Sequence, residues 1–220
     1  MRRVLVLVAV AALAAVAAST AAATNECRGL MVCVPVAGPW VVAAPAQVEF
    51  QMSCPPRYVV AGLDAELSTR GIDIGFVGAM GSPVNPGITT ARDVVFLGRL
   101  VRQERAATFR PHIGCVPAAG GGRRTPTAYH AFPPGKPSVR HATLFAIRGT
   151  TVRTVRCDRR ERLVRATHAV AFDAATPPGP ETVALVHAAQ RVRNGEVTLT
   201  ARAPAGAHAL VQVDLVCAPR

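Results

Sequence analysis

Aromatic residues are scarce in this chain, which has one Trp, two Tyr and seven Phe among 220 residues. Proteins that bind single-stranded nucleic acid or sugars by stacking need several exposed aromatic rings. The sequence also has no zinc-finger or RNA-binding signature, which argues against sequence-specific recognition of nucleic acid. The single tryptophan, Trp40, stands at the head of an apolar run and is predicted to lie in the core.

A catalytic signature is also missing. Ser82 lies in a glycine-rich stretch, but neither G-x-S-x-G nor a nearby base accompanies it. No H-E-x-x-H occurs, so zinc catalysis lacks its usual ligands. The acidic residues Asp64, Glu66 and Asp73 do not follow the EF-hand pattern, and they are interpreted as a polar cover on a sheet face rather than as a calcium site or a glycosidase pair. We therefore expect no enzymatic activity, no cofactor and no metal.

The six histidines are scattered along the chain. Strand alternation places the His112 side chain on the other face of its strand from the Cys115 side chain, which predicts an exposed ring. It places His168 on a core face, which predicts a buried ring with a partner. His130 lies between Tyr129 and Phe132 in a loop. That cluster is either a small-molecule contact or simply a loop folded onto the sheets.

Beyond the first residues, no stretch is apolar enough to span a bilayer. The chain begins with Arg2 and Arg3, continues with an apolar run of 15 residues at 4–18, and then has small residues up to Ala23. This pattern predicts a secretory signal peptide over residues 1–23, with release by the general route rather than by twin-arginine export. Cys27 lacks the small apolar neighbours of a lipoprotein site, so free release is favoured over lipid anchoring. The predicted location is secreted or extracytoplasmic, with association to the cell envelope as one possibility.

All six cysteines belong to the mature chain, and no two of them form C-x-x-C or face a histidine pair at zinc spacing. An even number of cysteines in an exported protein indicates disulfides. The cysteines are Cys27, Cys33, Cys54, Cys115, Cys157 and Cys217.

Two segments of the chain follow one design. Cys54 and Cys115 enclose 60 residues, while Cys157 and Cys217 enclose 59. In each segment, alternating residues follow the first cysteine, and an alternating run leads into the second, as in "FRPHIGCVP" and "VQVDLVCAP". A bridge that closes a loop of this length is worth about 4 kcal/mol in the entropic model. We therefore predict Cys54–Cys115 and Cys157–Cys217, which leaves Cys27–Cys33 for a small N-terminal loop.

Alternation after the first cysteine of each segment predicts which side chains face the core: Val59, Ala61, Leu63, Ala65 and Leu67 in one segment, and Val164, Ala166, His168, Val170 and Phe172 in the other. The predicted fold is all-β, with disulfide-stapled antiparallel sandwich-like halves in tandem. The first half covers residues 24–117, a Gly/Pro-rich linker or loop covers 118–138, and the second half covers 139–220. The alternative is a single sandwich in which the cysteine spacings agree by coincidence.

The stretch "CPPRYVVAGLDAEL" with its closing "HIGC" resembles small β domains of exported bacterial proteins, mostly uncharacterised, that open on Cys-Pro and close on a lone cysteine. The likeness covers about half of the mature chain. It departs from that pattern in having one glycine where a run is usual, and the second copy opens on "CDRRERLV" without proline. The resemblance implies the fold and export, and it implies no activity.

Basic charge is concentrated in the second half. Residues 24–119 carry eight Arg and seven acids, whereas residues 120–220 carry fourteen Arg, one Lys and six acids. Such an excess attracts polyanions, although the ratio of 24 Arg to one Lys also fits GC-rich codons and an ordinary solvated face. The candidate contact residues are Arg153, Arg156, Arg159, Arg160, Arg162 and Arg165, followed by the loop pair Arg123 and Arg124.

These observations favour an exported non-catalytic β module that contacts cell-envelope or other extracellular polyanions through its basic second half. The alternative is a structural or protein–protein interaction module with no polyanion role. The two hypotheses differ in salt dependence, because counterion release weakens polyanion contacts as ionic strength rises.

Overall fold

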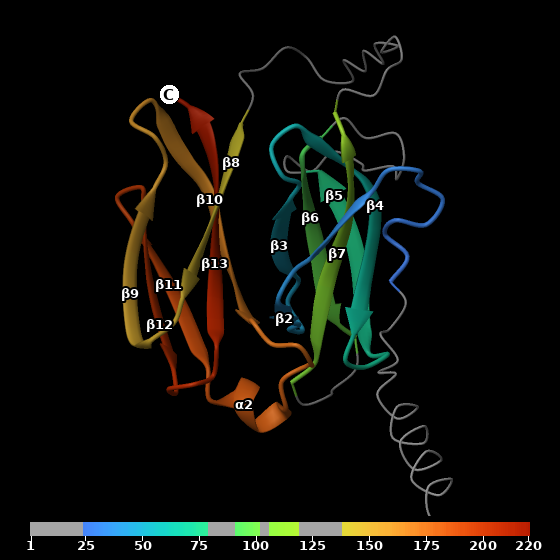
Figure 1. The fold of residues 1–220 in the computed structure, drawn as a ribbon. Coiled ribbons are helices and arrows are strands. Elements are labelled where there is room, and N and C mark those ends of the chain that lie inside the picture. The colour runs from blue at the N-terminus through green and yellow to red at the C-terminus, as the bar shows by residue number, and fades with distance from the viewer. Residues whose placement is uncertain (1–23, 79–90, 102–105, 119–137) are drawn as a thin grey trace, which may run out of the picture.

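The computed structural model describes residues 24–78, 91–101, 106–118 and 138–220. The predicted signal peptide, Ser82, the cluster around His130 and most of the predicted linker lie outside these residues. The described residues form strands and one short helix (Figure 1). The elements are β1 (Val34–Ala37), β2 (Trp40–Val42), β3 (Val48–Ser53), β4 (Tyr58–Leu67), β5 (Ile72–Gly78), β6 (Asp93–Leu100), β7 (Thr108–Pro117), β8 (Val139–Ala146), β9 (Gly149–Arg156), β10 (Glu161–Phe172), α2 (Pro180–Ala184), β11 (His187–Arg193), β12 (Glu196–Ala203) and β13 (Ala209–Pro219).

The all-β prediction is confirmed, and all the sheets are antiparallel. Asn194 and Gly195 form the turn that joins β11 to β12, and Arg193 lies directly opposite Glu196. Both turn residues have positive φ, 52° for Asn194 and 76° for Gly195, as a tight two-residue hairpin requires. The described part of the chain contains no helix that is long and apolar enough to cross a membrane.

Three sheets make up the fold. The largest has the order β1-β7-β2-β10-β13-β8, with β4 also paired to β7, and the two smaller sheets are β3-β6-β5 and β11-β12-β9. In both parts of the chain the strand after the first cysteine pairs with the strand that carries the second one, β4 with β7 and β10 with β13. In each part three other strands form a separate sheet, β3, β6 and β5 in the first and β9, β12 and β11 in the second. Figure 1 shows β9, β11 and β12 on the outer side of β8, β13 and β10, and β3 and β6 between that part of the large sheet and its other part, β4 and β7.

Apolar side chains form two cores. One is built on Phe50, Phe96 and Phe109 from the first part of the chain. The other is built on Phe172, Leu199 and further residues from the second part, and Trp40 of β2 belongs to it. The prediction that Trp40 is buried is therefore confirmed, and its strand joins the two parts by pairing with both β7 and β10.

The structure contains the three disulfides that the sequence predicts, Cys27–Cys33, Cys54–Cys115 and Cys157–Cys217. Cys54 follows β3 and Cys157 follows β9, so each long bridge ties the small sheet to the closing strand of the large one.

The predicted core faces of β4 and β10 are partly wrong, because each strand carries a β-bulge. In β4 the register shifts between Val60 and Gly62, and in β10 between Leu163 and Arg165. An extra residue at a bulge reverses the alternation on one side of it. Val60 is therefore buried in place of Val59, and Val164, expected in the core, is 53% exposed. Leu67 at the end of β4 is 41% exposed and is also outside the core.

The outer edge of β3 packs against the large sheet. Gln212 of β13 accepts a hydrogen bond from the backbone N–H of Gln51 at 2.7 Å and donates one to the Gln51 carbonyl at 3.0 Å. One buried amide side chain therefore satisfies both backbone groups at this point of the strand edge. The corresponding face of β4 and β7 is covered by the N-terminal segment, where the carbonyl of Glu26, just before the loop closed by Cys27–Cys33, lies against Gly62 and Gly114.

Candidate functional site

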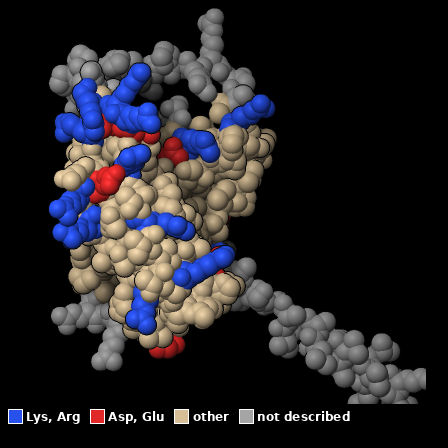
Figure 2. Space-filling model, turned by 90° about the vertical axis from the view of Figure 1, so that its left-hand side faces the viewer, with Lys and Arg blue, Asp and Glu red and all other residues tan. Residues whose placement is uncertain are grey.

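A basic surface follows the outer face of the sheet β11-β12-β9. Buried Val197, Leu199, Ala201 and Ala203 fix the inner face of β12, so Thr198, Thr200 and Arg202 point outward. The register then places Arg191 beside Thr198, and Arg193 beside Glu196, which in turn lies beside Arg156. Figure 2 shows this face of the molecule, on which basic side chains outnumber acidic ones.

The basic charge is densest at the end of this sheet that lies next to the Cys157–Cys217 bridge, where Figure 2 shows blue side chains gathered. A shallow hollow here is lined by the β9–β10 turn, the β11–β12 turn and the C-terminal residue. We call this surface the basic end. It comprises six arginines and three acids: Arg156, Arg159, Arg160, Arg162, Arg193 and Arg220 with Asp158, Glu161 and Glu196.

Five of the six arginines of the basic end are exposed and form no ion pair with a described carboxylate: Arg159, Arg160 and Arg162, together with Arg193 and Arg220. No carboxylate of the described residues lies within ion-pair distance of Arg159, Arg160 or Arg162. Arg156 approaches Glu196 at 3.6 Å, with both side chains largely exposed. An exposed pair at that distance contributes little, so Arg156 also remains able to bind an external anion.

The structure does not bring all the predicted arginines to this surface. The guanidinium of Arg153 lies over the Phe145 ring of β8, 6.0 Å from its centroid, and so points away from the outer face. Arg165 lies at the junction with β3, where it forms a bidentate pair with Glu49 at 2.5 and 3.0 Å. Arg123 and Arg124 lie outside the described residues.

The Arg165 pair belongs to a network that joins the two parts of the chain. Arg140 of β8 lies 2.9 Å from Glu49 and 2.8 Å from Asp214, and its side chain is only 3% exposed. Burial acts to raise the pKa of Glu49, but the ion pairs with Arg165 and Arg140 outweigh burial and lower that pKa below its ordinary value. Burial raises the pKa of Asp214, because its bond to Arg140 compensates only in part. Burial likewise opposes the charge of Arg140, yet the two carboxylates raise its pKa.

Four further arginines point outward but do not belong to the set predicted from the sequence: Arg191, Arg193, Arg202 and Arg220. The signal for three of them was available in the sequence. In "HAAQRVR" and "EVTLTARA", Arg alternates with residues that point inward, so the period of two would have placed these arginines on the outer face. Arg220 reaches the basic end because its side chain and backbone bond to the carbonyls of Glu161 and Arg160, contacts that no local pattern encodes.

The prediction that His112 is exposed is wrong. Its ring is buried between two carboxylates, with Nδ1 3.8 Å from Glu26 and Nε2 3.0 Å from Glu66, although the latter contact is poorly aligned for a hydrogen bond. The outward face of β4 and β7 is covered by the N-terminal loop, and strand alternation alone could not show this cover. Asp64 on the same face accepts the backbone N–H of Asn25 at 2.6 Å.

The prediction for His168 agrees with the structure, whereas the acidic residues do not lie on one sheet face. His168 is half-buried, and its Nδ1 lies 3.1 Å from Gln190 Oε1, as expected for a ring with a partner. Asp73 lies apart from Asp64 and Glu66, on β5, where it approaches Arg99 at 3.6 Å. The three acidic residues of the cluster therefore do not form one site.

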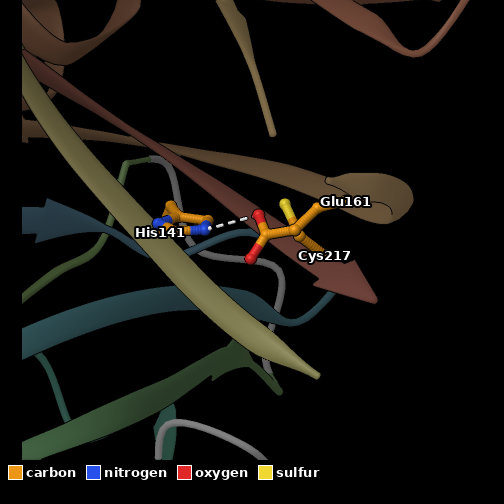
Figure 3. Close-up of side chains that lie close together, drawn as sticks. All are labelled: His141, Glu161 and Cys217. Atoms are coloured by element: carbon orange, nitrogen blue, oxygen red, sulfur yellow. Dashed lines mark hydrogen bonds and ion pairs between the residues drawn. The ribbon is translucent and has the colours of Figure 1, made fainter. Parts of the chain in front are cut away.

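The part of the chain that the structure describes contains one group of side chains with the geometry of a possible metal site. It consists of His141, Glu161 and Cys217, and all their ligand atoms lie within 4.8 Å of one another. Figure 3 shows His141 and Glu161 pointing toward each other beside the sulfur of Cys217. Because that sulfur is bonded to Cys157, it cannot act as a thiolate ligand in the oxidised protein.

Comparison with known proteins gives no relative for this chain: no family model matches it, and no curated protein or solved structure is similar to it.

Proposed function

We propose that the chain is an exported, non-catalytic β module that binds an anionic polymer of the cell envelope or its surroundings through the basic end. The single observation that carries this proposal is the set of Arg159, Arg160 and Arg162, which are exposed and lack acidic partners among the described residues. Arginines that balance internal charge would be paired, as Arg165 is paired with Glu49.

The chemistry of arginine suits a polymer of phosphate or sulfate groups. Its planar fork donates two parallel hydrogen bonds to one anionic group and is always charged. Strands in a sheet lie about 4.8 Å apart, so Arg193 and Arg156, on either side of Glu196, are about 10 Å apart. A flexible chain with regularly spaced charges can contact several such arginines at once.

We also propose that the fold is a tandem duplication of one sandwich-like unit, with halves at 24–117 and 139–220. Three features support it: the equivalent strand pairings, the equivalent long disulfides and the equivalent bulges. Both bulges begin at the residue opposite the closing cysteine, since Val60 pairs with Cys115 and Leu163 pairs with Cys217. A chance agreement of cysteine spacing would not place the bulges in register.

Export follows from the predicted signal peptide. The three disulfides are compatible with an extracytoplasmic location, because such bonds persist in oxidising compartments.

Co-sedimentation of the mature, oxidised protein with purified envelope, with long-chain polyphosphate as a soluble probe, tests the proposal across rising salt. We expect binding that weakens steeply with salt. Replacing Arg159, Arg160 and Arg162 by Ser should reduce the slope of log K against log salt by about 2, at about 0.7 per contact. The matched control replaces three exposed arginines of the first half, Arg28, Arg70 and Arg99, which removes the same charge and should change the slope little.

Two results would overturn the polyanion proposal. Equal losses in the two triple variants would mean that only net charge matters. Binding that resists salt would favour the alternative, a protein–protein interaction module. The observation that favours this alternative is the pair Met31 and Val32 in the N-terminal loop, which are 103% and 61% exposed.

A further inference from the structure

The two long disulfides have different neighbours. In the second half, His141 of β8 and Glu161 of β10 lie on either side of β13, where they pair with Leu215 and Pro219, two residues before and after Cys217. All these residues share the face of the sheet that carries the sulfur, so the two side chains meet beside it, with His141 Nε2 3.0 Å from Glu161 Oε2 (Figure 3).

In the first half, the residues at the same register hold no such pair. Val36 pairs with Ile113, two residues before Cys115, and Tyr58 pairs with Pro117, two residues after it. The Cys54–Cys115 bridge is therefore flanked by an aliphatic and a phenolic side chain at the positions where Cys157–Cys217 has an imidazole and a carboxylate. The first half provides a control within the same molecule.

We propose that reduction of the Cys157–Cys217 bridge creates a site for a zinc-like divalent cation, held by Cys157, Cys217, His141 and Glu161. Thiolate, imidazole and carboxylate are the ligand types that zinc takes in four-coordinate sites. The Cα atoms of Cys157 and Cys217 are 5.9 Å apart, so both sulfurs already lie in one place. A cation can reach the site from solvent, because the His141 side chain is 35% exposed and that of Glu161 is 16% exposed.

A two-electron reductant breaks the S–S bond: a dithiol becomes a disulfide, or a phosphine takes the oxygen of water and becomes a phosphine oxide. Cys157 and Cys217 each gain one hydrogen. Zinc then binds the two sulfurs and displaces both protons, while His141 provides a neutral nitrogen and Glu161 a carboxylate oxygen.

The proposal is independent of polyanion binding and has a thermodynamic consequence. Zinc binds the dithiol and not the disulfide, so zinc must favour the reduced form of this bridge. At free zinc 100 times its dissociation constant, the ratio of reduced to oxidised Cys157–Cys217 should rise about 100-fold. The Cys54–Cys115 bridge should not respond, because no imidazole or carboxylate stands at its two flanking positions.

The experiment titrates the mature protein with a water-soluble phosphine, with and without zinc. Free thiols are then alkylated, and mass spectrometry of the peptides measures the reduced fraction of each bridge in the same molecules. Circular dichroism follows the fold in parallel. We expect a zinc-dependent shift for Cys157–Cys217 alone, with the strand signal retained.

Two variants test the ligands. His141→Ala should weaken zinc binding by at least about 10-fold, since losing even an outer partner of a metal ligand has an effect of that size. The control, His187→Ala, removes an exposed imidazole from the outer face of β11 and should leave the shift unchanged. An equal response of both bridges, no response of either, an undiminished shift in His141→Ala, or loss of the fold despite zinc would each overturn the proposal.

Discussion

The two parts of the chain, before and after residue 118, pair β4 with β7 and β10 with β13, and the equivalent faces of these two strand pairs are covered in different ways. In the first half, Gly62 and Gly114 allow the backbone of Glu26 to lie directly on β4 and β7. In the second half, the pair that follows the bulge, equivalent to Gly62 and Gly114, is Arg165 and Val216. Arg165 binds Glu49 of β3, so a strand of the first half covers this face. One face is therefore closed by a short loop, and the other by the neighbouring half.

This difference shows how a shared scaffold can hold two kinds of interface. Glycine permits a close backbone approach, so the loop needs few side-chain contacts. The junction between the two parts instead depends on Arg140 and Gln212, which bind Glu49 and Gln51 of β3, while buried Asp214 pairs with Arg140. We expect the first interface to be sensitive to added volume and the second to be sensitive to lost charge.

The largest expected effect comes from removing either long bridge. The double variants Cys54→Ala with Cys115→Ala and Cys157→Ala with Cys217→Ala should each lose about 4 kcal/mol of unfolding free energy, because the closed loops are nearly equal in length. Urea unfolding followed by circular dichroism and by the fluorescence of Trp40, which lies in the second core, measures both. A clear difference between the two variants would mean that the halves do not share one stabilising design.

Replacing Arg140 by Met should be the next largest change, with a loss of about 3 kcal/mol, because it leaves Glu49 and Asp214 buried beside each other without the cation that they share. Urea unfolding at neutral pH measures the loss. Arg148→Met is the control, since Arg148 is exposed and forms no ion pair among the described residues. Similar losses in the two variants would show that the network does not hold the halves together.

The sequence predicted the strands and the disulfides because both leave local signals, in period-two alternation and in the spacing of cysteines. It could not predict the bulges at Ala61 and Val164, because a bulge is a shift in the pairing of two strands, and the residues of one strand alone do not show it. It also placed His112 on an exposed face, because nothing local shows that Glu26, 86 positions earlier, returns to cover that ring. Burial by a distant segment is a property of the whole fold.

Only part of the candidate site was predicted, again because a contact with a distant segment leaves no local signal. Arg159 and Arg160 lie in the β9–β10 turn and Arg162 at the start of β10, where a basic side chain is exposed by default, and all three are exposed. Arg165 lies in a strand only a few residues later, and its partner Glu49 is 116 positions away. A run of charge in the sequence therefore mixed surface arginines with one that binds the other half.

A smaller effect is expected from Glu49→Gln, which should cost about 2 kcal/mol at pH 7, as for lost hydrogen bonds to charged groups. Because the folded pKa of Glu49 is lowered, its contribution is present above the unfolded value near 4.5 and disappears as the pH falls through the folded value. The unfolding free energies of wild type and Glu49→Gln should converge in acid.

Asp214→Asn should act in the opposite sense, since a raised folded pKa means that ionisation of Asp214 costs stability as the pH rises. Urea unfolding from pH 3 to pH 7 measures both, with Asp73→Asn as an exposed control. A constant difference between wild type and Glu49→Gln across this range would contradict the assigned pairing.

The smallest global effect should come from Gly62→Ala. A Cβ at this position would collide with the Glu26 carbonyl, so the loop closed by Cys27–Cys33 should separate from β4 at a cost of about 1 kcal/mol. Gly75→Ala is the matched control, because a Cβ there would lie 3.8 Å from Leu97 in ordinary contact. Hydrogen exchange should show faster exchange at the Asn25 amide, which bonds to Asp64, in Gly62→Ala only. Unchanged exchange in both variants would mean that the loop adapts to the added volume, and the first interface would then be no more sensitive to volume than the junction between the halves.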